Sequence, residues 1–154
     1  MTVRATICEI IHDEMILLQY KRLDKFGGGK WNGPGGKLEP DESPYTGVSR
    51  EVFEETGLRI RAHELRGVLD FYFGRKSSPD WSCYIFYTEH YSGKPKDLGE
   101  GELRWFNLQN IPYDYMWKDD SFWLPILLEG KKFKGYFIYD SSSENIIDYE
   151  LNII

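Results

Sequence analysis

The feature that most constrains this chain is an acidic run between two glycines. Residues 36–58 read GKLEPDESPYTGVSREVFEETGL. Glu51, Glu54 and Glu55 are spaced i, i+3 and i+4, so a helix would place all three carboxylates on one face. Because like charges at this spacing destabilise an isolated helix, we expect a compensating partner. A hard divalent cation, Mg²⁺ or Mn²⁺, suits clustered carboxylate oxygens best.

The sequence also marks both ends of this helix. Residues 41–43 supply acidic and capping side chains, and Pro44 suits the first helical position. Gly57 suits a left-handed residue after the last turn. The helix is therefore expected between Pro44 and Gly57, with the carboxylates away from its packing side. An apolar stripe for packing is predicted at Tyr45, Val48 and Val52.

The glycines and the arginine around the carboxylates belong to a longer pattern, G-x5-E-x7-R-E-U-x-E-E-x-G-U, where U is an aliphatic residue. This pattern is the Nudix box, and the chain resembles the Nudix family of Mg²⁺-dependent nucleoside diphosphate hydrolases. A merely solvated acidic helix explains the charges but neither the glycines nor the arginine. The matching residues are Gly36, Glu42, Arg50, Glu51, Val52, Glu54, Glu55, Gly57 and Leu58.

The resemblance implies a fold, a cofactor and roles for individual residues. The implied fold is α/β, a Nudix-type α/β/α sandwich with a mixed β-sheet, formed by residues 1–154 as a single domain. Mg²⁺, or Mn²⁺ in its place, would assist water attack, with Glu55 or Glu51 as general base. Arg50 is expected to orient the carboxylates rather than to contact substrate. The implied metal ligands are Gly35, Glu51, Glu54, Glu55 and Glu100, with Glu102 competing for the place of Glu100.

Composition narrows the class of protein further. A length of 154 residues allows one domain with a real core. The net charge of −6 argues against a protein that coats a nucleic-acid polymer, but not against a single nucleotide that arrives with metal. Cys8 and Cys83 stand far apart, so we expect no disulfide framework and a cytoplasmic location. With no long apolar run, we expect no membrane association, and we expect a monomer.

The remaining sequence predicts a mixture of strands and one more helix. A turn at residues 12–14 should join the first two strands, and a helix at 121–129 should start near Asp119 or Asp120 and contain Pro125. Between the first strands and the box lies a basic, glycine-rich loop. The predicted strands are residues 2–11, 15–20, 65–73, 81–90, 102–107, 133–139 and 145–153.

The box describes phosphate chemistry but not the base of the nucleotide. A second segment, W-x-D-D-x-x-W-x-P at residues 117–125, is more discriminating. Together with Trp31-Asn32-Gly33 and residues 131–137, it resembles the MutT-type oxidised-purine nucleoside triphosphatases, the 8-oxo-dGTP hydrolases. The resemblance implies a nucleoside triphosphate as the small-molecule substrate, with nucleoside monophosphate and pyrophosphate as products. The chain departs from some of these relatives at Pro34 and in a loop at residues 23–25 that is one residue longer.

A purine site needs a flat apolar surface and polar groups that face the base edge. Trp117 is a candidate stacking plate. Asp119 and Asp120 are adjacent, so they cannot both ionise cheaply when buried; one could accept a hydrogen bond and the other donate one. Asn32 carries both a donor and an acceptor. The alternative for the two aspartates is a helix N-cap pair.

Four further residues are weaker candidates for substrate binding, each with a plain alternative. Phe71 and Phe73 alternate on one predicted strand and either wall the base pocket or pack in the core. Phe26 could cover the sugar or the base, and Lys21 could approach a phosphate. The alternative for each is a plain surface residue. Other Nudix substrates remain alternatives, namely nucleotide sugars, dinucleoside polyphosphates and capped RNA. So does a nucleotide-binding sensor without turnover.

Overall fold

The computed structural model describes all 154 residues, and its helix α1 (Pro44–Thr56) carries the acidic run. The helix begins as the sequence predicts, because the Ser43 side chain caps it by accepting a hydrogen bond from the Thr46 backbone N–H. It ends at Gly57, whose φ of 79° is left-handed and whose N–H donates to the Phe53 carbonyl. Val48 and Val52 are fully buried, and Tyr45, although half exposed, packs its ring on the buried Phe86 with a centroid distance of 4.9 Å, so the predicted packing stripe is confirmed.

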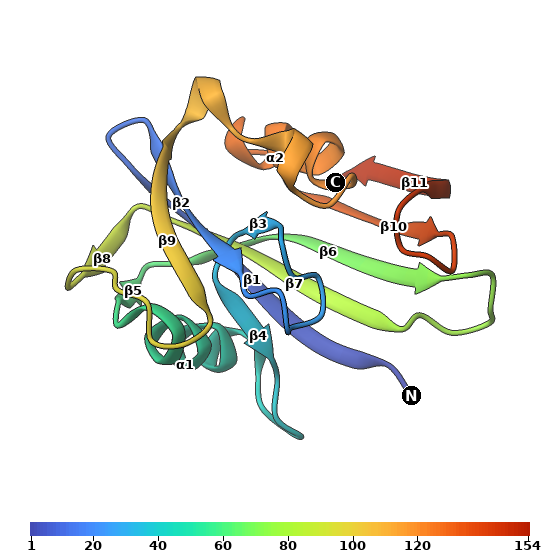
Figure 1. Cartoon of the computed structure of the whole chain (residues 1–154), viewed down its shortest axis with the longest axis horizontal. Coiled ribbons are helices and arrows are strands. Elements are labelled where there is room, and N and C mark those ends of the chain that lie inside the picture. Colours follow the sequence, from blue (N-terminus) through green and yellow to red (C-terminus); the bar gives the residue numbers. More distant parts are fainter.

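A mixed sheet forms the centre of the fold (Figure 1). Its main path runs in the order β11-β10-β6-β7-β1-β2-β3, with β4 also paired to β1 and β9 to β2. Strands β5 (Arg59–Arg61) and β8 (His90–Ser92) form a separate pair. The strands of the main sheet are β1 (Val3–His12), β2 (Met15–Lys21), β3 (Trp31–Asn32), β4 (Gly35–Lys37), β6 (Glu64–Phe73), β7 (Trp81–Thr88), β9 (Gly101–Asn107), β10 (Phe133–Tyr139) and β11 (Ile146–Ile153).

Strand β1 organises the sheet because its neighbours change along its length. On one side it pairs in parallel with β7 over Val3–Ile10. On the other side it pairs with β4 over Ala5–Ile7 and then with β2 at Ile11–His12. Glu9 therefore lies where the partner strand changes.

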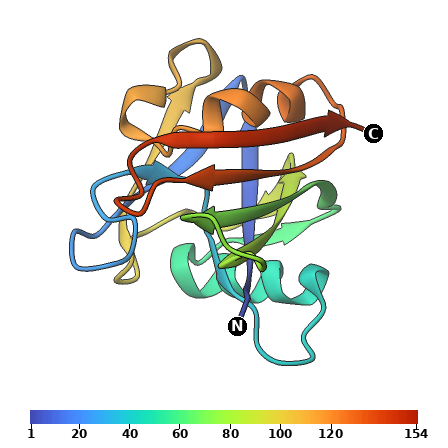
Figure 2. The ribbon, with the colours of Figure 1, turned by 90° about the vertical axis from the view of Figure 1, so that its right-hand side faces the viewer.

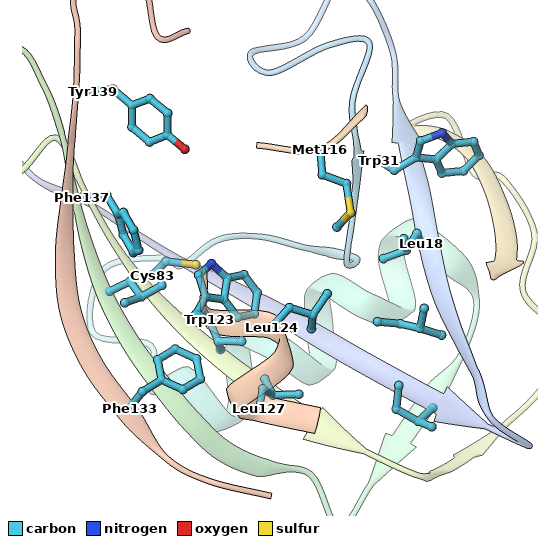
Figure 3. Close-up of a cluster of buried hydrophobic side chains, with 14 residues drawn as sticks. Leu18, Trp31, Cys83, Met116, Trp123, Leu124, Leu127, Phe133, Phe137 and Tyr139 are labelled. Carbon is cyan, nitrogen blue, oxygen red and sulfur yellow. The ribbon is translucent and has the colours of Figure 1, made fainter. Parts of the chain in front are cut away.

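The two helices cover opposite faces of this sheet, with α1 below and α2 (Asp120–Leu128) above it in Figure 1. Each helix has its own core. Cys8 and Ile10 of β1 pack with Val48 and Val52 of α1, whereas Ile11 belongs to the larger core with α2. Figure 3 shows the larger core, in which Trp123 and Leu124 of α2 meet side chains from the sheet. The predicted α/β/α sandwich is confirmed as a single domain.

Several element boundaries differ from the prediction. The predicted strand at residues 81–90 divides into β7 and β8, and the short strands β3, β4 and β5 were not predicted. Two 3₁₀ turns, Leu108–Asn110 and Tyr113–Tyr115, precede α2. In Figure 2 the hairpin of β10 and β11 lies across the edge of the molecule beside α2. Neither helix is long and apolar enough to span a bilayer.

Candidate active site

One pocket brings together residues from both halves of the chain. It opens where the strand next to β1 changes, and it lies mainly on the α2 side of the sheet. Its lining also reaches α1 through Glu55. Predicted site residues that line it are Lys21, Phe26, Asn32, Gly35, Glu55, Phe71, Phe73, Trp117, Asp119 and Asp120. Glu51, Glu54, Arg50 and Glu100 do not line it.

Arg50 holds the carboxylates of α1 together. Its guanidinium donates to both oxygens of Glu42, each at 2.8 Å, in a bidentate pair. One nitrogen also donates to Glu51 at 2.8 Å and to Glu54 at 3.1 Å. This pairing lowers the pKa of Glu42 to about 2. Much of the charge compensation on α1 is therefore internal to the protein, and Arg50 contacts three of its carboxylates.

Glu55 connects helix α1 to the pocket. The Gly35 backbone N–H donates to its Oε1 at 3.1 Å, and the nearby charge of Lys21 favours the ionised form. Burial outweighs these effects and raises the pKa of Glu55 to about 7. Burial likewise raises the pKa of Glu51, against the effect of its Arg50 hydrogen bond. A Cβ at Gly36 would overlap the Glu51 carboxylate, so a larger residue there would displace that side chain.

Glu100, rather than Glu102, acts electrostatically on Glu51 and Glu55. The charge of Glu100 contributes to the raised pKa values of both Glu51 and Glu55. Glu100 is paired only loosely, with Lys25 Nζ at 3.7 Å. Glu102 instead forms an exposed ion pair with Arg104 at 2.6 Å. Of the two candidates, Glu100 is the one whose charge acts on Glu51 and Glu55, and its role as a metal ligand stays a prediction.

Aromatic side chains wall the other end of the pocket. Phe26 stacks on Trp81 with a centroid distance of 5.6 Å and an interplanar angle of 9°. Phe26 also lies 5.6 Å from the Trp117 ring, and Phe73 lies 6.1 Å from it. Lys30 Nζ lies 5.0 Å from the centre of the Trp117 ring. Flat apolar surfaces of this kind suit a nucleobase.

Asp119 and Asp120 are both buried at the floor of the pocket, but they have different partners. Asp119 Oδ2 accepts a hydrogen bond from Trp123 Nε1 at 2.8 Å, and Oδ1 accepts one from the Tyr139 hydroxyl. Asp120 Oδ2 has no partner. Burial raises the pKa of both, and the charges of Asp119 and Glu9 raise that of Asp120 further. Asp119 occupies the N-cap position of α2, where the alternative interpretation placed it, but its side chain makes no capping hydrogen bond.

Comparison with known proteins places this geometry in a family. The NUDIX domain model matches residues 1–125. The chain belongs to the Nudix family. A Mus musculus oxidized purine nucleoside triphosphate hydrolase is 36% identical over 147 residues, which cover 95% of this chain and 92% of the relative. The Danio rerio enzyme of the same name is 32% identical, covering 96% and 92%. A Bacillus halodurans MutT protein has a similar structure, with a TM-score of 0.86, 26% identity and 97% coverage of both chains.

Nudix hydrolases generally use divalent metal ions, and the residues of this chain fit that requirement chemically. Glu51, Glu54, Glu55 and Glu100 offer hard carboxylate oxygens, and Gly35 can add a carbonyl. The raised pKa values of Glu51 and Glu55 reflect burial and mutual repulsion, which a cation would relieve. As they stand, these side chains do not form a group that could hold an ion, and Arg50 and Gly35 hydrogen-bond to some of their oxygens.

Three aromatic residues of this Nudix pocket were not assigned to the site by sequence reasoning. Trp81 lines it and stacks on Phe26, yet a tryptophan at a strand start carries no local signal for this role. Trp123 and Tyr139 hold Asp119 in place. The spacing of Trp123, four residues after Asp119, was an available signal for a shared helix face. Tyr139 comes from β10, and no local pattern connects it with α2.

The Arg50 network leads to a first prediction. Arg50→Lys should lower the melting temperature by about 5 °C and reduce turnover, because a lysine cannot reproduce the bidentate pair with Glu42. Thermal unfolding and steady-state kinetics would measure both effects. Arg104→Lys is the matched control, since Arg104 pairs with Glu102 on an exposed strand face. Equal, small effects of the two substitutions would contradict the organising role of Arg50.

Proposed function

We propose that this Nudix hydrolase cleaves oxidised purine nucleoside triphosphates such as 8-oxo-dGTP to the nucleoside monophosphate and pyrophosphate. The observation that carries the proposal is the pocket that joins Glu55 and Gly35 to Trp117, Asp119 and Asp120. A triphosphate near the glutamates would have its base beside the tryptophan and the aspartates. The two animal relatives, which are oxidized purine nucleoside triphosphate hydrolases, support the same substrate class. Such an enzyme cleans the nucleotide pool and thereby protects DNA.

Phosphate chemistry is assigned to the glutamates of α1. We propose that Mg²⁺, replaceable by Mn²⁺, is held by the Gly35 carbonyl and by Glu51, Glu54, Glu55 and Glu100. When bound, the ion neutralises the triphosphate and polarises its phosphoryl oxygens. Glu55 or Glu51 accepts the proton of the attacking water. Arg50 keeps Glu51 and Glu54 oriented, and Lys21 attracts the phosphates from beside Glu55.

Base recognition is assigned to the other end of the pocket. The base stacks on Trp117, while Phe26, Phe71 and Phe73 form the apolar walls. Asp119 accepts a hydrogen bond on each oxygen, which partly offsets the effect of burial on its pKa, and we assign it as the acceptor for base N–H groups. Asp120, protonated, donates to a base carbonyl. Asn32 lies at the same end and reads a further edge of the base.

The deciding experiment compares kcat/KM for 8-oxo-dGTP and dGTP with Mg²⁺ present. We expect the oxidised nucleotide to be preferred by at least about tenfold, since selectivity is a ratio of these constants. Ion chromatography should identify the monophosphate and pyrophosphate as products. Equal constants for the two nucleotides would remove the assignment to oxidised purines. Faster turnover of a nucleotide sugar or a dinucleoside polyphosphate would replace it with another Nudix activity.

Replacing the stacking surface gives a second prediction. Trp117→Ala should weaken binding of 8-oxo-dGTP by about 10- to 100-fold, because base stacking contributes roughly 1–3 kcal/mol. The loss should appear mainly in KM, and Trp117→Phe should restore much of it. Trp105→Ala, a half-buried tryptophan on β9 outside the pocket, is the control. An unchanged KM in Trp117→Ala would exclude stacking on this residue.

We further propose that the enzyme acts as a monomer in the cytoplasm on free nucleotides. Cys8 and Cys83 are both buried and unpaired, which is the usual state of cysteines in a reducing compartment. Light scattering at micromolar concentration would test the monomer directly.

A further inference from the structure

Gln19 on β2 is a buried carboxamide that lines the pocket. Its residue is 4% exposed. Its one side-chain hydrogen bond runs from Nε2 to the Gly101 carbonyl at 3.5 Å, the long limit for such a bond. Its Oε1 accepts no hydrogen bond, yet this atom is not fully enclosed, unlike the unpartnered oxygens of Glu9 and Asp120. Because a buried amide with so few partners is costly, a ligand in the pocket would complete its hydrogen bonding.

The pairing of β2 with β3 shows which side chains share a face with Gln19. Gln19 lies directly opposite Asn32. The next pair, Tyr20 and Trp31, packs its rings 5.1 Å apart in the larger core. Because side chains alternate along a strand, Gln19 and Asn32 point to the other face of these two strands. Both line the pocket, as does Lys21 two residues further along β2. The three polar side chains therefore belong to one surface of the pocket.

Gln19 lies between the residues assigned to the phosphates and to the base. Directly opposed side chains on antiparallel strands have Cβ atoms about 5 Å apart, which places Asn32 of the base end beside it. Side chains two residues apart on one strand are separated by about 7 Å, which places Lys21 of the phosphate end next to it along β2. In any nucleotide the sugar joins the base to the phosphates. A nucleotide with its phosphates near Lys21 and its base near Asn32 therefore has its sugar at Gln19.

We propose that Gln19 is a specificity-determining residue that binds the 3′-hydroxyl of the nucleotide sugar. Its free Oε1 accepts from the hydroxyl, and the second N–H of Nε2 is available to donate to it. A deoxyribonucleotide such as the proposed substrate carries this hydroxyl and has no polar group at position 2′. The pocket thus selects the sugar as well as the base, and it disfavours a nucleotide that lacks the 3′-hydroxyl. This inference rests on the proposed function for the class of ligand.

The test compares two substrates that differ only at the sugar. Values of kcat/KM with Mg²⁺ present would be measured for 8-oxo-dGTP and for its 2′,3′-dideoxy counterpart, with the wild type and with Gln19→Met. Methionine keeps the length of the side chain but lacks the amide group. We expect the wild type to prefer the substrate with the 3′-hydroxyl by at least about tenfold, and we expect this ratio to fall to within about twofold of one in Gln19→Met. A purely structural defect lowers both constants together and leaves their ratio in place.

Two further variants guard the interpretation. Gln109→Met, at an exposed glutamine outside the pocket, is the matched control and should keep the wild-type ratio. Gln19→Leu replaces Gln19→Met if methionine disturbs β2, and it should likewise bring the ratio close to one. A wild type that is indifferent to the 3′-hydroxyl overturns the proposal, and so does a wild-type ratio that persists after substitution of Gln19.

The same comparison with dGTP and its 2′,3′-dideoxy counterpart separates this inference from the proposed function. A wild type that does not prefer 8-oxo-dGTP to dGTP removes the assignment to oxidised purines. The ratio between dGTP and its dideoxy counterpart still decides the role of Gln19, because the contact is to the sugar and not to the base.

Discussion

Glu54→Gln is expected to lower kcat for 8-oxo-dGTP by roughly 10²- to 10⁴-fold while leaving the fold intact. The Glu54 side chain is 54% exposed and its carboxylate is engaged by Arg50 alone, so the amide should be accommodated without repacking. The loss should follow from removing one negative oxygen donor from the proposed metal site. Steady-state kinetics over a range of Mg²⁺ concentrations would measure it, with circular dichroism as the check on folding.

Two comparisons make this result specific. Glu39→Gln removes a charge from an exposed residue in the loop before α1, and it should leave kcat within about twofold of the wild type. Chelation of divalent ions should abolish turnover in every variant, and Mn²⁺ should restore it in the wild type. A Glu54→Gln enzyme with near-normal kcat at low Mg²⁺ would remove Glu54 from the metal site.

Glu9→Gln is expected to make the protein more stable at alkaline pH, by on the order of 4 kcal/mol at pH 9. The pKa of Glu9 is raised by burial from its ordinary 4.5 to about 8, so the folded state holds a proton that the unfolded state has released. The contribution of Glu9 to the free energy of unfolding should therefore be greatest below pH 4.5, and it should decline as the pH rises to 8. A neutral amide carries no such dependence.

Urea unfolding at several pH values would measure the difference between the two proteins. The curves of wild type and Glu9→Gln should nearly coincide near pH 4.5 and separate progressively up to about pH 8. Glu150→Gln, at an exposed residue of β11, should change stability little at any pH. A constant difference between wild type and Glu9→Gln at every pH would mean that packing, rather than ionisation, distinguishes them.

The reach of sequence reasoning differs between the two ends of the pocket. Ser43, Pro44 and Gly57 fix the ends of α1 through local backbone chemistry, so the helix and the shared face of its glutamates could be predicted. Asn32, Trp117, Asp119 and Asp120 were identified from the resemblance, and they do line one pocket. The contacts that distinguish Asp119 from Asp120 come from Trp123 and Tyr139, and Tyr139 stands on β10, 20 residues away along the chain.

By itself, the acidic run between Gly36 and Leu58 identified the family, predicted helix α1 and indicated a reaction at a phosphate group. The shared face of its glutamates could be predicted because the spacing of residues along a helix decides which side chains lie together. Only the tertiary structure showed which carboxyl groups are paired with a positive charge and which are buried without a partner. Arg50 gathers Glu42, Glu51 and Glu54, whereas Glu9 and Asp120 each have a buried carboxyl oxygen without a hydrogen-bond partner. The protonation of a carboxyl group depends on its burial and on neighbours from distant strands. Neither can be read from the order of residues along the chain.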